Sequence, residues 1–400
     1  MNKTTITALI FVLMLPLTAR ADDDIKNDYF NPVNTGVLSL GIPPDARGSS
    51  LGNLGAATDP DMNSQFWNPA KYAFGYSQGG LAISYTPWMR KIVNDIFLAG
   101  VAGYWKPGRD DNQAISASFR YFSLGEVTMT ELGEDVQTVN PYELALDIGY
   151  SRKLSNKFSM GVVLRYILSD LSYDDAYTGE SSNAASAFSA DISGYFTYYP
   201  MIGRNECQFS WGFDVSNIGT KVSYDKGATS AFLPTNLRIG ANFMFPLADY
   251  HTLAVGLDLN KLLVPTRPRT DQYDMETTEG QTAYEEALQK WNDTSSISGI
   301  FKSFSDAPGG FGEELKEIGV SVGAEYAYNH QFFARLGYNY QHPSKGGLSY
   351  FSFGAGFSLK QIVQLDAAYM VATSQNSPLD QTLRFTLTFD TDGLKELLGR

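Results

Sequence analysis

The amino-acid sequence predicts an all-β protein, a closed antiparallel β-barrel of fourteen strands that spans an outer membrane. Polar and apolar residues alternate in segments of about ten residues, as in strands with one lipid-facing and one water-facing side. The segment from Thr382 to Phe389 alternates without an exception. The connections between such segments are short and long in turn, as in outer-membrane barrels. After the N-terminus, no apolar run reaches the roughly 18 residues of a membrane-spanning helix, so strands are expected to cross the membrane.

Composition limits the partners and the chemistry. The formal net charge is −13, which disfavours nucleic acid as a partner because its phosphates bind basic surfaces. Cys207 is the single cysteine, so the chain forms no intramolecular disulfide and no cysteine-based metal centre. Aromatic residues make up 14% of the sequence and glycines number 37. Both values suit the aromatic girdles and crowded walls of a barrel.

The N-terminal residues have the features of a secretory signal. Lys3 supplies a positive charge, an apolar run extends from Ile6 to Leu17, and Ala19-Arg20-Ala21 forms a small-x-small cleavage site. The apolar run is too short to span a bilayer. We therefore expect a signal peptide (1–21), an N-terminal plug or lid segment (22–79), the barrel (80–389) and a periplasmic C-terminal tail (390–400).

Fourteen segments alternate like strands, and an even number is typical of bacterial single-chain barrels. They cover residues 80–88, 94–106, 113–124, 141–154, 157–168, 185–199, 207–217, 235–246, 251–263, 317–328, 331–341, 348–360, 361–373 and 381–389. Connections such as 154–157 and 328–331 are short, and the long ones are residues 125–140, 169–184, 218–234 and 264–316. Short turns face the periplasm and long loops face the outside in such barrels, so the loop lengths predict the orientation.

Charged residues in the middle of these strands define the expected lumen. A charge facing lipid there would cost about 2–4 kcal/mol, so these side chains are expected to point inward. They are Arg120, Glu143, Asp147, Arg165, Asp191, Asp214, Arg238, Asp258, Glu325, Arg335, Asp366 and Arg384. The set suits either an ion-selective pore or a network of cross-strand salt bridges in a narrow barrel. The mixed signs favour the network, because a selective ring would have one sign.

Residues 37–74 precede the barrel and do not alternate. Gly48 and Gly55 allow close approaches of the backbone, and Asp59-Pro60 and Asn68-Pro69 initiate turns. A compact stretch at this place in the chain is expected to fill the lumen as a plug or to close the periplasmic end as a lid. The sequence leaves both interpretations open.

Four runs in this stretch form a specific pattern. They are Pro44-Asp45-Ala46-Arg47-Gly48, Leu51-Gly52, Ala56-Ala57-Thr58-Asp59-Pro60-Asp61 and Trp67-Asn68-Pro69-Ala70-Lys71-Tyr72-Ala73-Phe74. On these residues the chain resembles the PorV family, outer-membrane barrels of the type IX secretion system of Bacteroidetes. The sister family PorQ shares part of the pattern, and a looser form of it occurs in the FadL-like transporters of long-chain fatty acids. The resemblance extends over the whole chain after the signal peptide.

This resemblance implies a FadL-like barrel with long extracellular loops and a function in protein export. PorV-like proteins are thought to receive secreted cargo through its C-terminal signal domain beside the translocon barrel, SprA (also called Sov). They then pass the cargo to the attachment complex that contains PorU. Outer-membrane lipid would surround such a barrel. The alternative is a FadL-like outer-membrane transporter of hydrophobic small molecules.

The connection 264–316 is too long for a passive loop and contains two stretches with helical spacing of apolar residues. The first has Tyr284, Leu288 and Trp291, and the second has Ile297, Ile300, Phe301 and Phe304. The second stretch is expected either to dock a protein partner, since exposed apolar patches usually mark interaction sites, or to fold over the barrel mouth as a cap.

Motifs for catalysis are missing from the sequence. His251, His330 and His342 are the only histidines and lack metal-ligand spacing. The pattern Gly-x-Ser-x-Gly occurs at residues 48–52, 75–79 and 319–323, but none of these runs joins a predicted strand to a predicted helix as a nucleophile elbow does, and the chain has no glycine-rich phosphate loop. The sequence therefore predicts a protein that is not an enzyme and that has no cofactor and no metal site.

Overall fold

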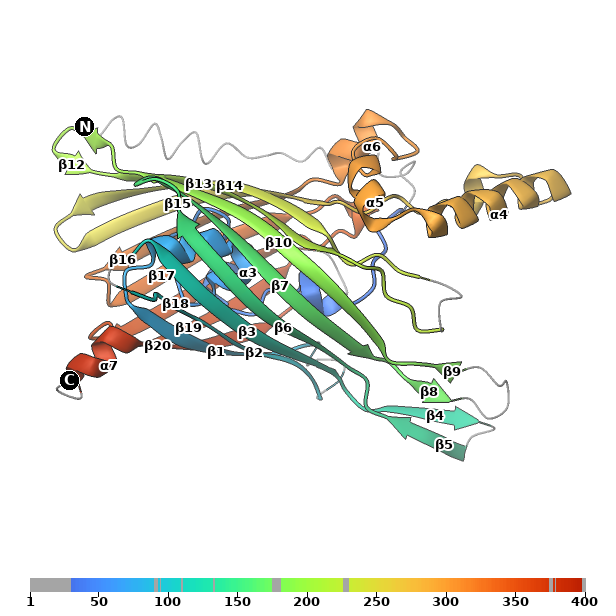
Figure 1. Ribbon diagram of the computed structural model, residues 1–400, viewed down its shortest axis with the longest axis horizontal. Helices are drawn as coiled ribbons and strands as arrows, with labels where there is room; N and C mark the ends of the chain where they lie inside the picture. Colours follow the sequence, from blue (N-terminus) through green and yellow to red (C-terminus); the bar gives the residue numbers. More distant parts are fainter. Residues whose placement is uncertain are drawn as a thin grey trace.

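The structure, a computed structural model, describes residues 30–397 apart from 90–92, 94, 109–110, 132–133, 175–180, 226–229, 374–376 and 378. Fourteen antiparallel strands form a closed barrel in which the last strand pairs with the first (Figure 1). The expected signal peptide, residues 1–21, lies outside the described residues.

The prediction of fourteen strands is confirmed, with boundaries within a few residues of those expected. The first seven are β1 (Gly79–Pro87), β2 (Ile96–Trp105), β3 (Gln113–Leu124), β6 (Tyr142–Lys153), β7 (Phe158–Asp170), β10 (Ala185–Tyr198) and β13 (Gln208–Gly219). The others are β14 (Asn236–Ala248), β15 (His251–Leu262), β16 (Gly319–Tyr328), β17 (Phe332–Tyr340), β18 (Tyr350–Leu359), β19 (Val363–Ala372) and β20 (Leu383–Asp390).

Side chains alternate between the two faces of the wall as the sequence pattern requires. On β20, Arg384 is fully buried, whereas its neighbour Phe385 is 43% exposed on the outside. On β7, Arg165 is buried and Leu164 is exposed. Because strand side chains have a period of two, one register places the mid-strand charges inward and the apolar residues between them toward lipid. Both the apolar outer surface and the closed strand order are therefore those of an outer-membrane barrel.

Three of the predicted connections contain short two-stranded ribbons outside the barrel. At the end with the long loops, β4 (Val127–Glu131) pairs with β5 (Glu134–Val139), and β8 (Tyr173–Asp174) pairs with β9 (Ser181–Ser182). At the opposite end, β11 (Met201–Ile202) pairs with β12 (Asn205–Glu206). Residues 125–140 are therefore a hairpin that extends beyond the wall, not an irregular loop, because antiparallel neighbours can continue their hydrogen-bond ladder past the membrane.

The connection between β15 and β16 contains three helices rather than the two expected. They are α4 (Thr278–Asp293), α5 (Ser296–Lys302) and α6 (Phe311–Lys316), preceded by the 3₁₀ turn η4 (Thr270–Gln272). Thr277 and Ser295 cap α4 and α5 through their side chains. A further 3₁₀ turn, η5 (Pro343–Lys345), follows β17, and α7 (Thr391–Leu397) follows β20. Among the described residues, no helix is long and apolar enough to cross a membrane.

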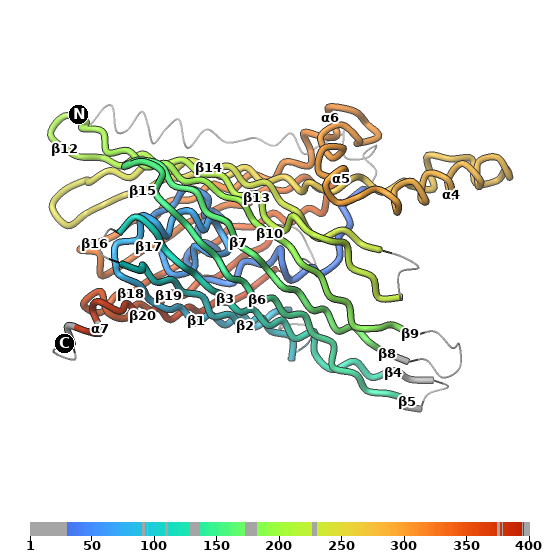
Figure 2. Tube along the Cα trace, viewed as in Figure 1, coloured from blue at the N-terminus to red at the C-terminus, as the bar shows by residue number. Residues whose placement is uncertain are grey.

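Residues 30–78, which we call the inserted segment, run along the inside of the barrel toward β1 (Figure 2). Four short elements lie in it: η2 (Leu38–Gly41), α2 (Ala46–Ser50), α3 (Ser64–Trp67) and η3 (Pro69–Phe74). Near its start, the amide of Asn31 donates to Ser344 in the loop after β17 at 2.7 Å. Near its end, the Lys106 ammonium donates to the Gly75 carbonyl beyond β2. The segment therefore extends from the long-loop end to the short-turn end.

This path predicts that Phe30, which is 70% exposed, faces the outside of the cell, because the long-loop end of such barrels is extracellular. In a Cys207→Ser background, we expect Phe30→Cys to react with a membrane-impermeant maleimide on intact cells. Tyr250→Cys, in the short turn between β14 and β15, is the matched control and should react only after the membrane is opened. If Tyr250→Cys were labelled on intact cells and Phe30→Cys were protected, the barrel would have the opposite orientation to the one predicted.

Candidate functional site

Arg47 joins the inserted segment to the barrel wall. Its guanidinium donates to both oxygens of Glu325 on β16, at 3.1 and 2.9 Å, and to Asp61 within the segment at 2.9 Å. Arg335 on β17 donates to the same Glu325 at 2.6 Å and to Asp366 on β19 at 2.6 Å. A chain of alternating charges therefore runs from the segment across three strands, and one carboxylate is shared by two arginines.

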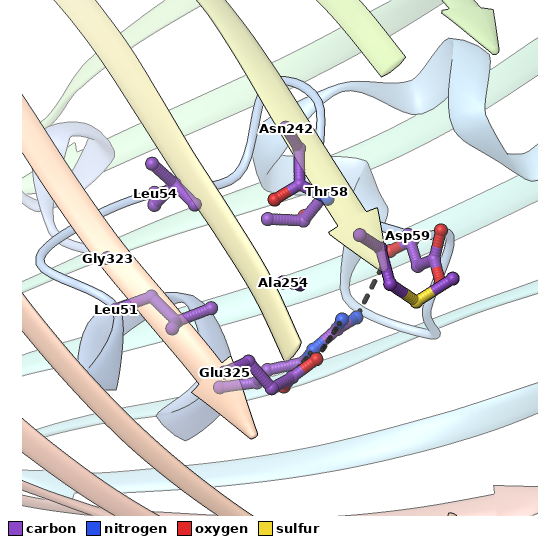
Figure 3. Close-up of a pocket in the computed structure, with 10 residues that line it drawn as sticks. Leu51, Leu54, Thr58, Asp59, Asn242, Ala254, Gly323 and Glu325 are labelled. Carbon is purple, nitrogen blue, oxygen red and sulfur yellow. Dashed lines mark hydrogen bonds and ion pairs between the residues drawn. The ribbon is translucent and has the colours of Figure 1, made fainter. Parts of the chain in front are cut away.

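A small pocket lies beside this chain, between the inserted segment and strands β14, β15 and β16 (Figure 3). Leu51 and Leu54 supply apolar surface, and Arg47 and Glu325 supply charge. The Arg47 guanidinium also donates to the carbonyl of Asp59 at the rim, at 3.1 Å. The charged groups are already paired with one another, so the pocket presents no isolated charge to a ligand.

Trp67 is the centre of packing in the inserted segment. Its indole N–H donates to Asp45 at 2.6 Å, and the other oxygen of Asp45 caps α2 by accepting from the Gly48 amide at 2.8 Å. A Cβ built on Gly48 or on Gly55 would lie 2.3 Å from atoms of the indole. The ring is therefore held between two glycine backbones, which explains why glycines occupy both positions.

Further hydrogen bonds fix the backbone of the segment to the wall. Asp258 on β15 accepts from the amides of Gly55 and Ala56 at 2.7 and 2.8 Å. The Asn68 side-chain amide donates to the carbonyl of Ala56 at 2.7 Å and to the carbonyl of Gly194 on β10 at 3.0 Å. Because buried backbone groups need partners, a strand carboxylate here replaces the partner that regular secondary structure would supply.

Burial shifts the ionisation of several groups in the segment. Burial raises the pKa of Asp45 to about 6, and the nearby Asp61 carboxylate adds to the rise. Burial lowers the pKa of Lys71 to about 8, against the opposing effect of Asp61. At Arg47, burial lowers the pKa, but the carboxylates of Glu325 and Asp61 outweigh burial and raise it. Arg47 is thus a fixed cation, whereas burial disfavours the charged forms of Asp45 and Lys71.

The expected lumen residues separate into groups with different partners. Arg165 forms one cluster, donating to Asp147 at 2.7 and 3.0 Å and to Asp191 at 3.1 and 2.8 Å. Glu325, Arg335 and Asp366 form the other cluster, with Arg47. Glu143, Arg120, Arg238 and Asp258 bond to the inserted segment. Asp214 and Arg384 join neither cluster, since neither forms an ion pair with a residue that the structure describes.

The start of the inserted segment lies across the barrel mouth. The amide of Gly36 donates to the Phe232 carbonyl at 2.8 Å, and the side chain of Asn31 donates to Glu313 of α6 at 3.0 Å. Val37 and Leu40 are buried in an apolar cluster with residues of β6, β7 and β10. Val37 has φ of 51°, a strained value for a β-branched residue. Tertiary contacts therefore hold this part of the chain in the mouth.

Helices α5 and α6 and the turn after α5 present a group of exposed apolar side chains that we call the external patch. Its members are Ile297, Phe301, Phe304, Phe311 and Leu315, exposed by 64%, 73%, 49%, 77% and 51%. Ile300, which was predicted to belong to the same stripe, is half-buried. Ion pairs hold α6 to the barrel: Lys261 contacts Glu314 and Glu317, and Lys345 contacts Glu313 and Glu317. These ion pairs fix the position of α6, and with it Phe311 and Leu315, relative to the barrel.

The closed strand order, the apolar outer face and the charged interior define an outer-membrane β-barrel. A family model described as "Type IX secretion system protein PorV" matches residues 25–269, more than half of the chain. The chain therefore belongs to the PorV family and is an outer-membrane component of the type IX secretion system. This family is not one of enzymes.

Several solved structures are similar to this chain at low sequence identity. The toluene transporter TodX of Pseudomonas putida has a TM-score of 0.47 and 11% identity, over 86% of this chain and 96% of that chain. The toluene transporter TbuX of Ralstonia pickettii has a TM-score of 0.45 and 12% identity, with the same coverage of 86% and 96%. A FadL homologue of Pseudomonas aeruginosa has a TM-score of 0.45 and 13% identity, over 90% and 99%. No curated protein matches the sequence.

Some features of the site were not predicted from the sequence. The sequence motif identified Arg47 but not its pairing with Asp61, and nothing in the sequence indicated the mouth contacts of Asn31 and Val37. Phe311 and Leu315 of the external patch were also missed. Their spacing of four residues was a usable signal of a third helix. The contacts of Asn31 join residues about 280 to 310 positions apart, and single-sequence periodicity contains no such information.

Proposed function

We propose that this protein receives secreted cargo at the type IX translocon, through the C-terminal signal domain of the cargo, and delivers it to the surface attachment complex. The partners would be the translocon barrel SprA (Sov), the cargo and the PorU complex. Membership of the PorV family supports the assignment to this secretion system. The external patch supports a binding role, because apolar patches of this kind usually mark interaction sites.

The interior supports binding at the surface rather than passage through the lumen. Residues of the inserted segment such as Trp67, Asn68 and Lys71 are almost fully buried against the wall. Charged residues of the wall, including Asp258 and Glu325, hydrogen-bond to the segment. We propose that the segment acts as a plug whose removal would break many buried contacts. Its motif residues Pro44 to Gly48 and Trp67 to Pro69 would then maintain the plug rather than contact cargo.

We assign the docking of the translocon to the external patch. We expect Phe301→Glu combined with Phe304→Glu to reduce co-purification of SprA at least tenfold, because two charges replace aromatic anchors of the kind that dominate protein interfaces. The matched control is Met275→Glu, which is 36% exposed in the same connection but outside the patch. Heat-modifiable migration in gels would verify that both variants form the barrel. Undiminished SprA recovery with the double variant would reject this docking site.

A FadL-like transporter of hydrophobic small molecules remains the second candidate, favoured by the partly apolar pocket beside Leu51 and Leu54. A deletion strain separates the two functions. We expect loss of surface proteins that have the C-terminal signal domain, with normal uptake of hydrophobic compounds. An uptake defect with normal surface proteins would instead support transport.

A further inference from the structure

Two adjacent inward-facing residues hold buried polar atoms without a partner in the described part of the chain. Arg384 on β20 is 0% exposed, and its Nε, Nη1 and Nη2 atoms have no hydrogen-bond acceptor. Thr86 on β1 is also 0% exposed, and its hydroxyl has no partner. Buried donors in native proteins are nearly always satisfied. A guanidinium has five N–H donors in a planar fork, so this site holds an unusual number of free donors.

The register of the strands places these donors together. Tyr85 pairs with Phe385 across the β1–β20 junction, so Thr86 lies opposite Arg384 one residue further along the ladder. Both side chains point inward, because Phe385 and Tyr85 are exposed on the outside. The junction between β1 and β20 is also where the barrel closes. The donors therefore lie at the seam between the first and the last strand.

The carboxylate of Asp45 does not satisfy these donors. Asp45 lies within electrostatic range of Arg384, but its two oxygens already accept from Trp67 and Gly48. The other oriented contact of the guanidinium is the ring of Trp88, whose centroid is 5.7 Å from Arg384 Cζ. An aromatic face attracts a cation but accepts no strong hydrogen bond from the fork. The in-plane donors of Arg384 remain available.

The surroundings limit the size of an acceptor. Tyr350, Met370 and Leu379 form a buried apolar cluster, and Trp88 packs against it. Leu98, which pairs with Thr86 on the opposite strand, is also buried. These side chains exclude bulk water and carry no charge, and the Tyr350 hydroxyl, which lies within electrostatic range of Arg384, accepts no hydrogen bond from the guanidinium. The acceptor must therefore be compact, and an anion is favoured over a water molecule because only an anion compensates the buried positive charge.

We propose that Arg384 and Thr86 bind a compact planar oxyanion of the carboxylate type, the size of formate or acetate, at the seam of the barrel. The two oxygens of such an anion match the guanidinium fork in a bidentate arrangement. One of these oxygens also accepts from the Thr86 hydroxyl. Because the donors come from β1 and β20, the bound anion bridges the two strands that close the barrel and stabilises their pairing. A ligand that binds only the folded state raises the unfolding midpoint.

The test uses the full-length protein, purified in detergent and exchanged into sodium gluconate, whose anion is too bulky for the site. Thermal unfolding is then measured as formate replaces gluconate at constant ionic strength. We expect the midpoint to rise by several degrees with formate in the wild type and to be independent of formate in Arg384→Met. Thr86→Val, which keeps the shape of the side chain, should require about tenfold more formate, as expected for loss of one hydrogen bond to a charged group.

Thr388→Val is the matched control, since Thr388 lies on the same face of β20 and pairs with Ala82 of β1 at the same seam. It should respond to formate like the wild type. If the unfolding midpoint of the wild type does not change with formate, the proposal is overturned and internal water satisfies the donors. If the midpoint of Arg384→Met rises equally, formate acts as an adventitious ion only, and the proposal is also overturned. If Arg384→Met does not fold, crystals soaked in bromide decide: an anomalous peak beside Arg384 supports the site, and its absence rejects it.

Discussion

Replacing Arg165 with methionine is expected to lower the free energy of unfolding by about 3–5 kcal/mol, the cost of removing one partner from a buried ion pair. The Arg165 guanidinium makes four hydrogen bonds to Asp147 and Asp191, and all three side chains are at most 5% exposed. Without it, two carboxylates from β6 and β10 would face each other across β7 in a site that excludes water.

The origin of this effect can be tested by rescue. Asp147→Asn and Asp191→Asn, added to Arg165→Met, remove the two unpaired charges and should recover most of the lost stability. Arg152→Met is the matched control, because Arg152 lies exposed on β6, and it should change the free energy of unfolding by less than about 0.5 kcal/mol. Denaturant unfolding in detergent gives the measurement. If the triple variant is no more stable than Arg165→Met alone, repulsion between the carboxylates is not the cause.

The second large effect is expected at Trp67. Trp67→Ala should lower the free energy of unfolding by about 3–5 kcal/mol, because it leaves a cavity in the inserted segment and removes a donor from Asp45. Gly48→Ala should also destabilise, although it adds a single methyl group, because the new Cβ would lie 2.3 Å from Trp67. Limited proteolysis would locate the loosened part of the chain in residues 44–74.

Gly41→Ala is the control for the glycine substitution. A Cβ at Gly41 would meet no atom within 4 Å, so we expect unfolding and proteolysis like those of the wild type. Equal destabilisation by Gly41→Ala and Gly48→Ala would mean that glycine flexibility in the segment matters more than contact with the indole. A stable Trp67→Ala variant would show that the ring is not the centre of packing.

The strands were predictable because each one obeys a local rule. In β20, the alternation from Leu383 to Phe389 fixes both the strand and its lipid-facing side, since lipid and lumen impose opposite requirements on successive residues. The same rule placed Arg165 and Asp147 inside before any contact was known. The segment predicted at residues 94–106 is apolar on both faces and so lacks this alternation, but it too is a strand of the barrel, β2.

The inserted segment could be recognised but not placed. Its motif identified Arg47, Trp67 and Asn68 as candidate site residues, but the partners of Arg47 in the wall lie about 280 residues away. The external helices show the same limit. The apolar spacing of Phe301 and Phe304 predicted a helix but did not determine whether it faces solvent or covers the mouth, because a stripe on a short helix is the same in both arrangements.

The sequence alone therefore determined the class of fold, the number of strands, the inward charges and the family, because each depends on residues close together in the chain. Only the tertiary structure decided that the inserted segment starts at the external mouth, that Arg165 and Arg335 belong to separate ion-pair clusters, and that Arg384 has no hydrogen-bond partner among the described residues. These properties depend on which strands lie side by side and on what fills the space between them. Closure of the barrel sets both, by bringing β1 against β20 and enclosing residues 30–78.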